Sequence, residues 1–136
     1  MRSIRYSNNG KGHIELKDAS VTFSGPGGQK IEALSATNLN IEPASFVSLI
    51  GPSGCGKSTI LNSIGGFVEL SSGQILLDDV RVTGINPEIG VVFQQYALFP
   101  WLTALGNVMF ALKRFRMSKD ERKQRAYAVL KDVGLQ

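Results

Sequence analysis

One glycine-rich segment, residues 51–59, constrains the fold more than any other part of the chain. It fits the pattern G-x-x-x-x-G-K-[ST], and it follows an apolar run, residues 46–50, that is typical of a buried strand. The pattern predicts a strand, a glycine loop and a helix in that order. Glycines let the backbone approach an anion closely, so that successive N–H groups point at one phosphate at the positive end of the helix.

The same segment predicts a site for a nucleoside triphosphate. Lys57 would reach the outer phosphates, and the Ser58 hydroxyl would take a place on Mg²⁺. The alternative is a glycine-rich turn that binds no ligand, but the flanking strand and helix patterns favour the nucleotide site. The predicted binding residues are Gly51, Ser53, Gly54, Cys55, Gly56, Lys57, Ser58 and Thr59.

Length and composition fit one compact domain with a real core, since the chain has 136 residues, 43% of them apolar and 19% charged. No apolar run approaches the roughly 18 residues of a membrane span, and the first residues lack a signal-type apolar segment. We therefore expect neither a membrane crossing nor an export signal.

Cys55 is the only cysteine, which excludes an internal disulfide and fits a reducing cytosol. Its thiol lies where a helix should begin, so alkylation should compete with nucleotide.

The positive charge is concentrated at the end of the chain. The net charge is +4, and residues 113–136 contain eight basic and three acidic residues. Such a segment could bind nucleic acid or anionic lipid. A solvated helix face is the better interpretation, because acidic residues are interspersed and no aromatic residues alternate with the basic ones to stack on bases. We expect no nucleic-acid partner.

Two stretches before the glycine segment alternate apolar and polar residues. Residues 14–23 are expected to form a strand with one buried face, and residues 34–41 a second strand that pairs back against it. Residues 24–29 should form the turn between them. Residues 1–12 are interpreted as a flexible leader.

After the glycine segment, a helix is expected over residues 57–67, with Ile60, Leu61 and Ile64 on one buried face and glycines at its end. A hairpin is expected over residues 74–82, and a buried apolar strand of the core sheet at 90–93. A helix is expected from Thr103 to about Phe115. The last predicted helix begins at the capping box of Ser118 and runs to Lys131 or Asp132, before Gly134.

Three segments together closely resemble the nucleotide-binding subunit of ATP-binding-cassette (ABC) transporters: residues 51–59, the hairpin at 73–78, and GVVFQQYALFPWLT at 90–103. The resemblance covers residues 13–136. Within the family, FPWLT is similar to importers for nitrate, aliphatic sulfonates and taurine. The implied fold class is α/β: a P-loop NTPase core with a mixed sheet, an antiparallel β subdomain at residues 13–45 and 74–83, and the start of a helical subdomain from about residue 103.

The resemblance implies ATP and Mg²⁺ as cofactors and assigns roles to single residues. Phe23 matches the aromatic residue that stacks on adenine, although a core phenylalanine at a strand end is an equal alternative. Gln94 matches the glutamine that ligates Mg²⁺ and positions the attacking water, which an amide can do as acceptor and donor at once. The alternative for Gln94 is a polar residue that closes a strand. Lys57 and Gln94 are thus the candidate catalytic residues, and Ser58 and Gln94 the candidate metal ligands.

The resemblance also implies partners and a location. The segment from Tyr96 to Trp101 is similar to the exposed apolar surface that receives the transmembrane permease subunit, because apolar residues crowded into a loop favour a partner surface over water. A packed loop is the alternative. A second ATP-binding subunit would complete a dimer, and the protein would lie peripherally on the cytoplasmic face of the plasma membrane.

This sequence departs from the family pattern at several positions. Ala44-Ser45 replaces the usual Gly-Glu, Asp79 the usual glycine, and Gly106 the usual acidic residue before an asparagine. The 136 residues also hold no Leu-Ser-Gly-Gly-Gln signature, no Walker B strand ending in Asp-Glu and no switch histidine, a role for which His13 is a poor candidate. We therefore expect ATP binding without efficient hydrolysis.

Two alternatives to a transport ATPase stay open. One is a non-catalytic nucleotide-binding module that docks a membrane partner. The other is a different small P-loop phosphotransferase that uses Asp78 or Asp79 on the metal, because residues 75–79 have the form of a Walker B strand. That strand follows Lys57 by too few residues and matches the hairpin of the family instead.

Overall fold

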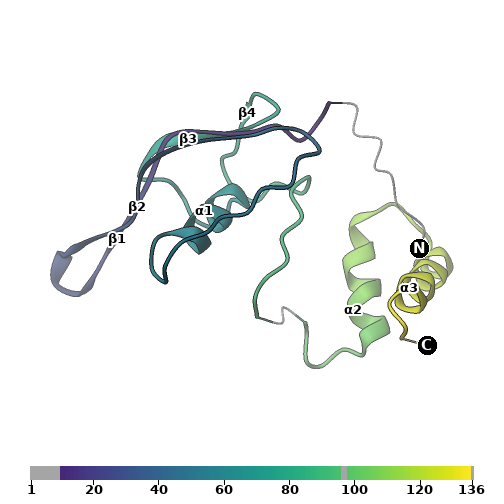
Figure 1. Ribbon diagram of the computed structural model, residues 1–136. Helices are drawn as coiled ribbons and strands as arrows, with labels where there is room; N and C mark the ends of the chain where they lie inside the picture. Colours follow the sequence, from purple (N-terminus) through teal and green to yellow (C-terminus); the bar gives the residue numbers. More distant parts are fainter. Residues whose placement is uncertain (1–9, 96–97, 136) are drawn as a thin grey trace. The chain divides into compact units, whose positions relative to one another are not determined.

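The computed structural model describes residues 10–95 and 98–135, and the chain divides into two units, one ending at Val91 and the other beginning at Val92. This differs from the single compact domain expected from length. Among the described residues, the first unit contains a β-sheet and one α-helix, and the second contains helices without a strand (Figure 1).

The sheet of the first unit has four strands in the order β2-β1-β3-β4, and every neighbouring pair is antiparallel. The strands are β1 (Ile14–Ser24), β2 (Lys30–Ile41), β3 (Ser72–Leu77) and β4 (Val80–Arg81), with a short 3-10 turn, η1 (Pro26–Gly28), between β1 and β2. The α/β class and the antiparallel β subdomain are thus confirmed, as are the predicted hairpins. The sheet that the structure describes contains no parallel pair, so the mixed sheet does not form within it.

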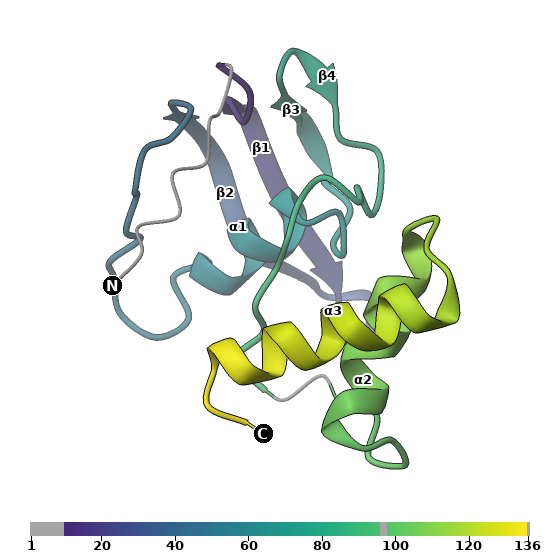
Figure 2. The same ribbon diagram turned by 90° about the vertical axis from the view of Figure 1, so that its right-hand side faces the viewer.

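Helix α1 (Lys57–Ile64) lies on one face of this sheet (Figure 2). Ile60 and Ile64, one helical turn apart, are both buried against the inward-facing side chains of the strands. The core residues are Leu16, Ala19, Val21, Leu34, Ile60, Ile64 and Ile75. Leu61, predicted on the same face, is 56% exposed, because it lies on the flank of the helix away from the sheet.

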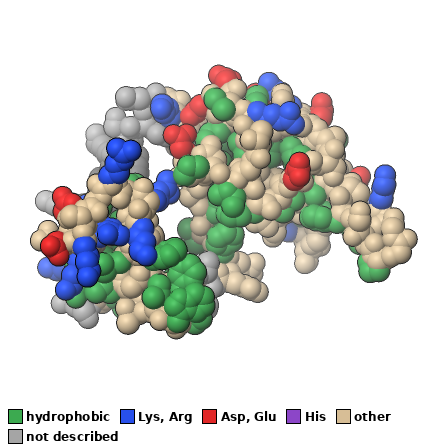
Figure 3. Space-filling model, turned by 180° about the vertical axis from the view of Figure 1, so that it is seen from behind, with side chains coloured by type: hydrophobic (Ala, Val, Ile, Leu, Met, Phe, Trp, Pro, Cys, Tyr) green, Lys and Arg blue, Asp and Glu red, His purple; other side chains and the backbone are tan. Residues whose placement is uncertain are grey.

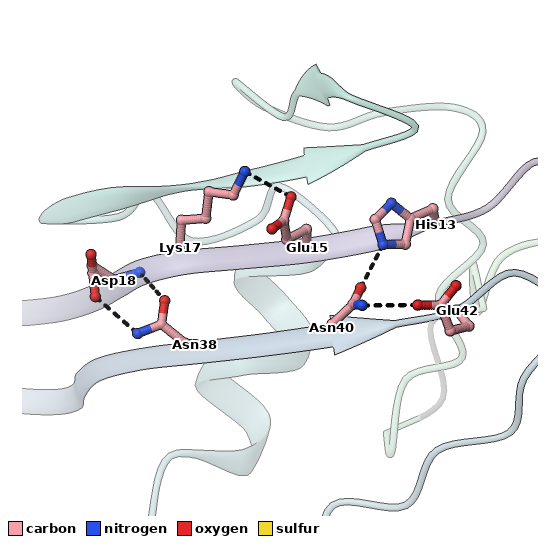
Figure 4. Close-up of polar contacts among 7 residues, drawn as sticks. All are labelled: His13, Glu15, Lys17, Asp18, Asn38, Asn40 and Glu42. Atoms are coloured by element: carbon pink, nitrogen blue, oxygen red, sulfur yellow. Dashed lines mark hydrogen bonds and ion pairs between the residues drawn. The ribbon is translucent and has the colours of Figure 1, made fainter.

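Polar side chains fasten β1 to β2 beside this core (Figure 4). Asn38 Nδ2 donates to Asp18 Oδ1 at 2.9 Å, and the Asp18 backbone N–H donates to Asn38 Oδ1 at 2.9 Å, where the strand register shifts. His13 Nε2 is hydrogen-bonded to Asn40 Oδ1. His13 therefore has a structural contact on β2.

Two apolar segments that were predicted to be buried strands are not strands in the structure. Residues 46–50 and 90–93 have no strand conformation, and Phe46, Ile50 and Val92 are 93%, 94% and 99% exposed. A central strand needs neighbours for its backbone groups and for both of its faces. No described strand pairs with either segment, so their apolar sequence is not sufficient to make them strands.

The second unit contains α2 (Ala104–Ala111), the 3-10 turn η2 (Leu112–Arg114) and α3 (Lys119–Asp132), with α2 packed against α3. Both predicted helix starts are confirmed. Thr103 caps α2 by accepting from the Gly106 N–H at 3.0 Å, and Ser118 and Glu121 form the predicted capping box of α3. Among the described residues, no helix is both long and apolar enough to cross a bilayer.

Candidate nucleotide-binding site

The glycine segment forms a loop that leads directly into α1. Gly56 is the N-cap of the helix, with φ of +91°, and Lys57 is its first residue. No side chain caps this end of the helix. The first backbone N–H groups of an α-helix have no partner within it, so they are available to an anion at the positive end of the helix dipole.

Gly56 also brings the loop against the sheet. A Cβ on this residue would lie 2.8 Å from the Ala33 carbonyl oxygen and 3.3 Å from Leu34 Cδ1, both on β2. A side chain is therefore excluded by the positive φ and by the neighbouring strand together. The loop therefore lies directly against β2 at Gly56.

Lys57 folds back over the loop. Its Nζ donates to the Gly51 carbonyl at 2.8 Å and to the Pro52 carbonyl at 2.6 Å, and it lies 3.5 Å from Cys55 Sγ. The two carbonyl oxygens accept hydrogen bonds from the ammonium group, as phosphate oxygens would. Because the lysine side chain is long and flexible, its ammonium group can leave these carbonyls without a movement of the backbone.

The other predicted loop residues lie around this lysine. Cys55 is exposed, and its Sγ lies so close to Gly51 that a Cβ there would be 2.6 Å away. Ser58 is exposed in the first turn of α1, and Thr59 is half-buried beside it. The predicted phosphate-binding residues are thus brought together in one exposed loop, and their ligand roles stay predictions.

Phe23 lies near the end of β1, opposite Ile31 of β2, and is 47% exposed. It is therefore not a core residue, which was the alternative to adenine stacking. Ile31 is two residues from Ala33, the residue that Gly56 approaches, and two strand residues span about 7 Å. Phe23 and the loop thus lie around the same end of β2. Stacking on adenine stays a prediction.

Gln94 is an exposed residue of the second unit. Its predicted role toward Mg²⁺ and the attacking water stays a prediction. No group of three or more His, Cys, Asp or Glu side chains in residues 10–95 and 98–135 is placed to hold a metal ion.

Asp78 and Asp79 form the turn between β3 and β4, as the resemblance implied. Both have left-handed backbones, with φ of 49° and 64°. Asp78 Oδ1 accepts hydrogen bonds from the backbone N–H groups of Gly12 and His13 at 2.7 and 2.9 Å. This oxygen of the Asp78 carboxylate is occupied by the chain itself, and the phosphotransferase that would use Asp78 or Asp79 on the metal stays an untested alternative.

The second unit presents an apolar surface in its first segment. Tyr96 and Ala97 lie outside the described residues, but Leu98 and Trp101 are 65% and 76% exposed. The Phe99 ring packs on the Trp101 ring at 5.3 Å between centroids and edge-on to the Phe110 ring at 4.7 Å. The described part of the Tyr96 to Trp101 surface is thus partly packed and partly open to solvent.

Asn107 fixes this surface, a role that the sequence reasoning missed. Its Oδ1 accepts from the Phe99 N–H at 2.8 Å, and its Nδ2 donates to the carbonyls of Phe99, Leu102 and Thr103 at 3.3, 3.2 and 3.0 Å. The position of Asn107, four residues after the N-cap of α2, could have indicated this role, because a side chain there faces the residues that precede the helix.

A family model described as "ABC transporter" matches residues 34–136. A nitrate import ATP-binding protein of Synechocystis sp. is 44% identical over 123 residues, which are 90% of this chain and 46% of that protein. A taurine import ATP-binding protein of Rhizobium johnstonii is 41% identical over 122 residues, 90% of this chain and 47% of that protein. The chain therefore spans less than half the length of these relatives.

Among solved structures, the chain is similar to a dimeric ATP-binding cassette in a post-hydrolysis state bound to ADP and Pi. The identity is 40% and the TM-score 0.76, over 87% of this chain and 56% of that one.

Proposed function

The chain belongs to the ABC transporter family, and from this we propose that it is the N-terminal part of the ATP-binding subunit of an importer. The importer would couple ATP binding and hydrolysis to the uptake of a small anion such as nitrate, a sulfonate or taurine. The names of the nitrate and taurine relatives support this class of substrate. The observation that carries the proposal is the geometry of the loop, with Lys57 held over it and α1 starting at Gly56.

ATP would bind with its phosphates at the N-terminus of α1. The backbone N–H groups of residues 53–58 would donate to the phosphate oxygens, and Lys57 would exchange its bonds to Gly51 and Pro52 for bonds to the outer phosphates. Bound Mg²⁺ would bridge and neutralise phosphate oxygens. Ser58 and Gln94 would hold that ion, and Phe23 would stack on the adenine.

These 136 residues by themselves would bind nucleotide and hydrolyse it poorly. The resemblance implies a glutamate as general base, at the end of a Walker B strand that is not among them. Lys57 stabilises phosphate charge, but it does not activate water. Binding without efficient turnover is the consequence.

The partners of the whole subunit would be a transmembrane permease and a second ATP-binding subunit. The permease would contact the surface from Tyr96 to Trp101, where exposed apolar side chains support a partner. The protein would then lie on the cytoplasmic face of the membrane without entering it.

Titration of a fluorescent ATP analogue with Mg²⁺ tests the binding proposal. Lys57→Ala should weaken binding by about 10-fold to 150-fold, since a hydrogen bond to a charged group contributes about 1.5–3 kcal/mol. Lys131→Ala, in the last turn of α3, is the matched control and should leave the affinity unchanged. Equal affinities of the two variants would contradict the proposal. Steady ATP turnover that Lys57→Ala abolishes would contradict the claim of poor hydrolysis.

A further inference from the structure

The first unit has a cavity of about 350 Å³ between the C-terminal end of α1 and the segment that follows β4. Ile75 of β3, which is 2% exposed, lines it from the sheet. The Val82 N–H donates to the Ile75 carbonyl at 2.9 Å and holds the segment after β4 against the sheet. None of the described lining residues belongs to the glycine segment. The cavity far exceeds the space of one water and lies within the size range of small-molecule sites.

Main chain bounds one side of this cavity. Gly66, two residues after the end of α1, has φ of +74°, and a Cβ there would overlap the Gly84 carbonyl oxygen. Both glycines line the cavity. The two segments can approach each other in this way only because residue 66 has no side chain. This side of the cavity is therefore set by the backbone and not by exposed side chains that could move aside.

Ser63 has an unpaired hydroxyl at the same cavity. The residue lies near the end of α1, is 3% exposed and lines the cavity. Among the described residues, its Oγ has no hydrogen-bond partner, not even the helix carbonyl that serine often uses. Buried hydroxyls in folded proteins nearly always have a partner, because burial without one is unfavourable. The cavity is the place from which a partner can reach this oxygen.

Two opposite charges line the cavity without pairing to each other. Glu69 lies between Val68 and Leu70, which pack against the core, and Arg81 lies on β4 opposite Leu76. Among the residues that the structure describes, neither Glu69 nor Arg81 is in an ion pair. Figure 3 shows acidic and basic side chains interspersed over the first unit. A ligand that carries both charges on a short spacer can therefore contact both groups.

We propose that this cavity binds a small zwitterion of the amino acid or aminosulfonate class. The Arg81 guanidinium donates to the carboxylate or sulfonate of the ligand, and the Glu69 carboxylate accepts from its ammonium group. Ser63 Oγ gains a hydrogen bond to the ligand. Glu69 and Arg81 are exposed, so each ion pair alone contributes little in water, and affinity depends on both ends being held at once. This inference goes beyond the proposed function and does not depend on ATP binding.

Titration of the ¹⁵N-labelled chain with four small molecules tests the class of ligand. Taurine and β-alanine carry an ammonium and an anionic group on the same two-carbon spacer, whereas ethanesulfonate and propionate lack the ammonium. The zwitterions should shift the amide signals of Ser63, Gly66 and Gly84, which line the cavity. They should bind about 3-fold to 10-fold more tightly than the matched anions. Amide signals of residues 51–59 should not shift.

Substitutions assign the contacts. Ser63→Ala and Arg81→Gln should each weaken taurine or β-alanine binding by about 3-fold to 10-fold. Glu69→Gln should abolish the preference for taurine over ethanesulfonate. Arg125→Gln, exposed on α3 and outside the lining, is the matched control for Arg81→Gln and should leave binding unchanged. Ser63→Ala removes a polar group that is buried without a partner, so the variant should fold, and its spectrum without ligand checks this.

Three results would overturn the inference. One is the absence of shifts around the cavity with all four molecules, which would show that the cavity holds only water. Another is equal binding of taurine and ethanesulfonate, and the third is binding that Ser63→Ala and Arg81→Gln both leave unchanged. Shifts confined to residues 51–59 would also count against it, because the anion would then lie at the N-terminus of α1. Nucleotide affinity is a separate measurement, so none of these results bears on the proposed function.

Discussion

Alanine at Gly56 should destabilise the first unit more than alanine at Gly54. Both glycines have left-handed backbones, with φ of +91° and +83°, so each substitution costs about 1–2 kcal/mol in backbone strain. They differ in their surroundings. A Cβ on Gly56 would lie 2.8 Å from the Ala33 carbonyl oxygen, whereas nothing lies within 4 Å of a Cβ on Gly54.

The steric term decides the magnitude. The Ala33 oxygen belongs to the backbone of β2, so it can move away only if the loop or the strand shifts. Overpacking of this kind costs about 1–3 kcal/mol. Alanine also lowers the conformational entropy of the unfolded chain, which stabilises both variants by about 0.4–1 kcal/mol. This effect cancels in the comparison. We therefore expect Gly56→Ala to be less stable than Gly54→Ala by about 1–3 kcal/mol.

Hydrogen exchange of the amides in β1 and β2 measures this difference within the first unit. The protected amides should exchange about 5-fold to 150-fold faster in Gly56→Ala than in Gly54→Ala. Equal exchange rates in the two variants would refute the reasoning, because the backbone strain alone would then explain both. ATP-analogue affinity should fall in the same order, since the shifted loop is the proposed phosphate site.

Three further predictions concern other sites. Alkylation of Cys55 should be slower with MgATP than without it, because its thiol lies beside the Lys57 ammonium that the phosphates would engage; equal labelling rates would contradict this. Ser118→Ala should lower the stability of α3 by about 1 kcal/mol by loss of the cap. The Ser118 N–H, and then its hydroxyl, hold the pKa of Glu121 below its ordinary value. The stabilisation of α3 by ionised Glu121 is therefore complete above the ordinary carboxyl pKa and is lost as pH falls through the lowered pKa. Helix content that is independent of pH down to strong acid would argue against it. Asn107→Ala should cost about 1–3 kcal/mol and raise the mobility of Trp101, measured by fluorescence anisotropy, whereas unchanged anisotropy would show that the loop does not depend on the amide.

The parts of the fold that the sequence predicted correctly depend on short-range signals. The capping box of Ser118 and Glu121 identified the start of α3, and the glycine segment identified the start of α1. The turn at Asp78-Asp79 was placed by the strand-like segments on either side of it, residues 74–77 and 80–82. In each case the residues that determine the structure lie within a few positions of one another.

The parts that failed depend on distant partners. Residues 46–50 and 90–93 have strand-like composition, but a strand exists only where another strand accepts its hydrogen bonds. The bonds from Lys57 to the Gly51 and Pro52 carbonyls and the four bonds of Asn107 follow from side-chain conformations that no spacing rule contains. The candidate site could thus be located from the sequence, whereas the contacts within it could not.

The two hydrogen bonds that Asp78 accepts from Gly12 and His13 have a consequence for the order of folding. The bonds join residues 65 and 66 positions apart, and they hold a turn whose left-handed aspartates are unfavourable by themselves. The β1–β2 hairpin involves only short loop closures and can form early, whereas the tight β3–β4 turn has to wait until the start of β1 arrives beside it. This turn, although local in sequence, should be among the last contacts of the first unit to become native.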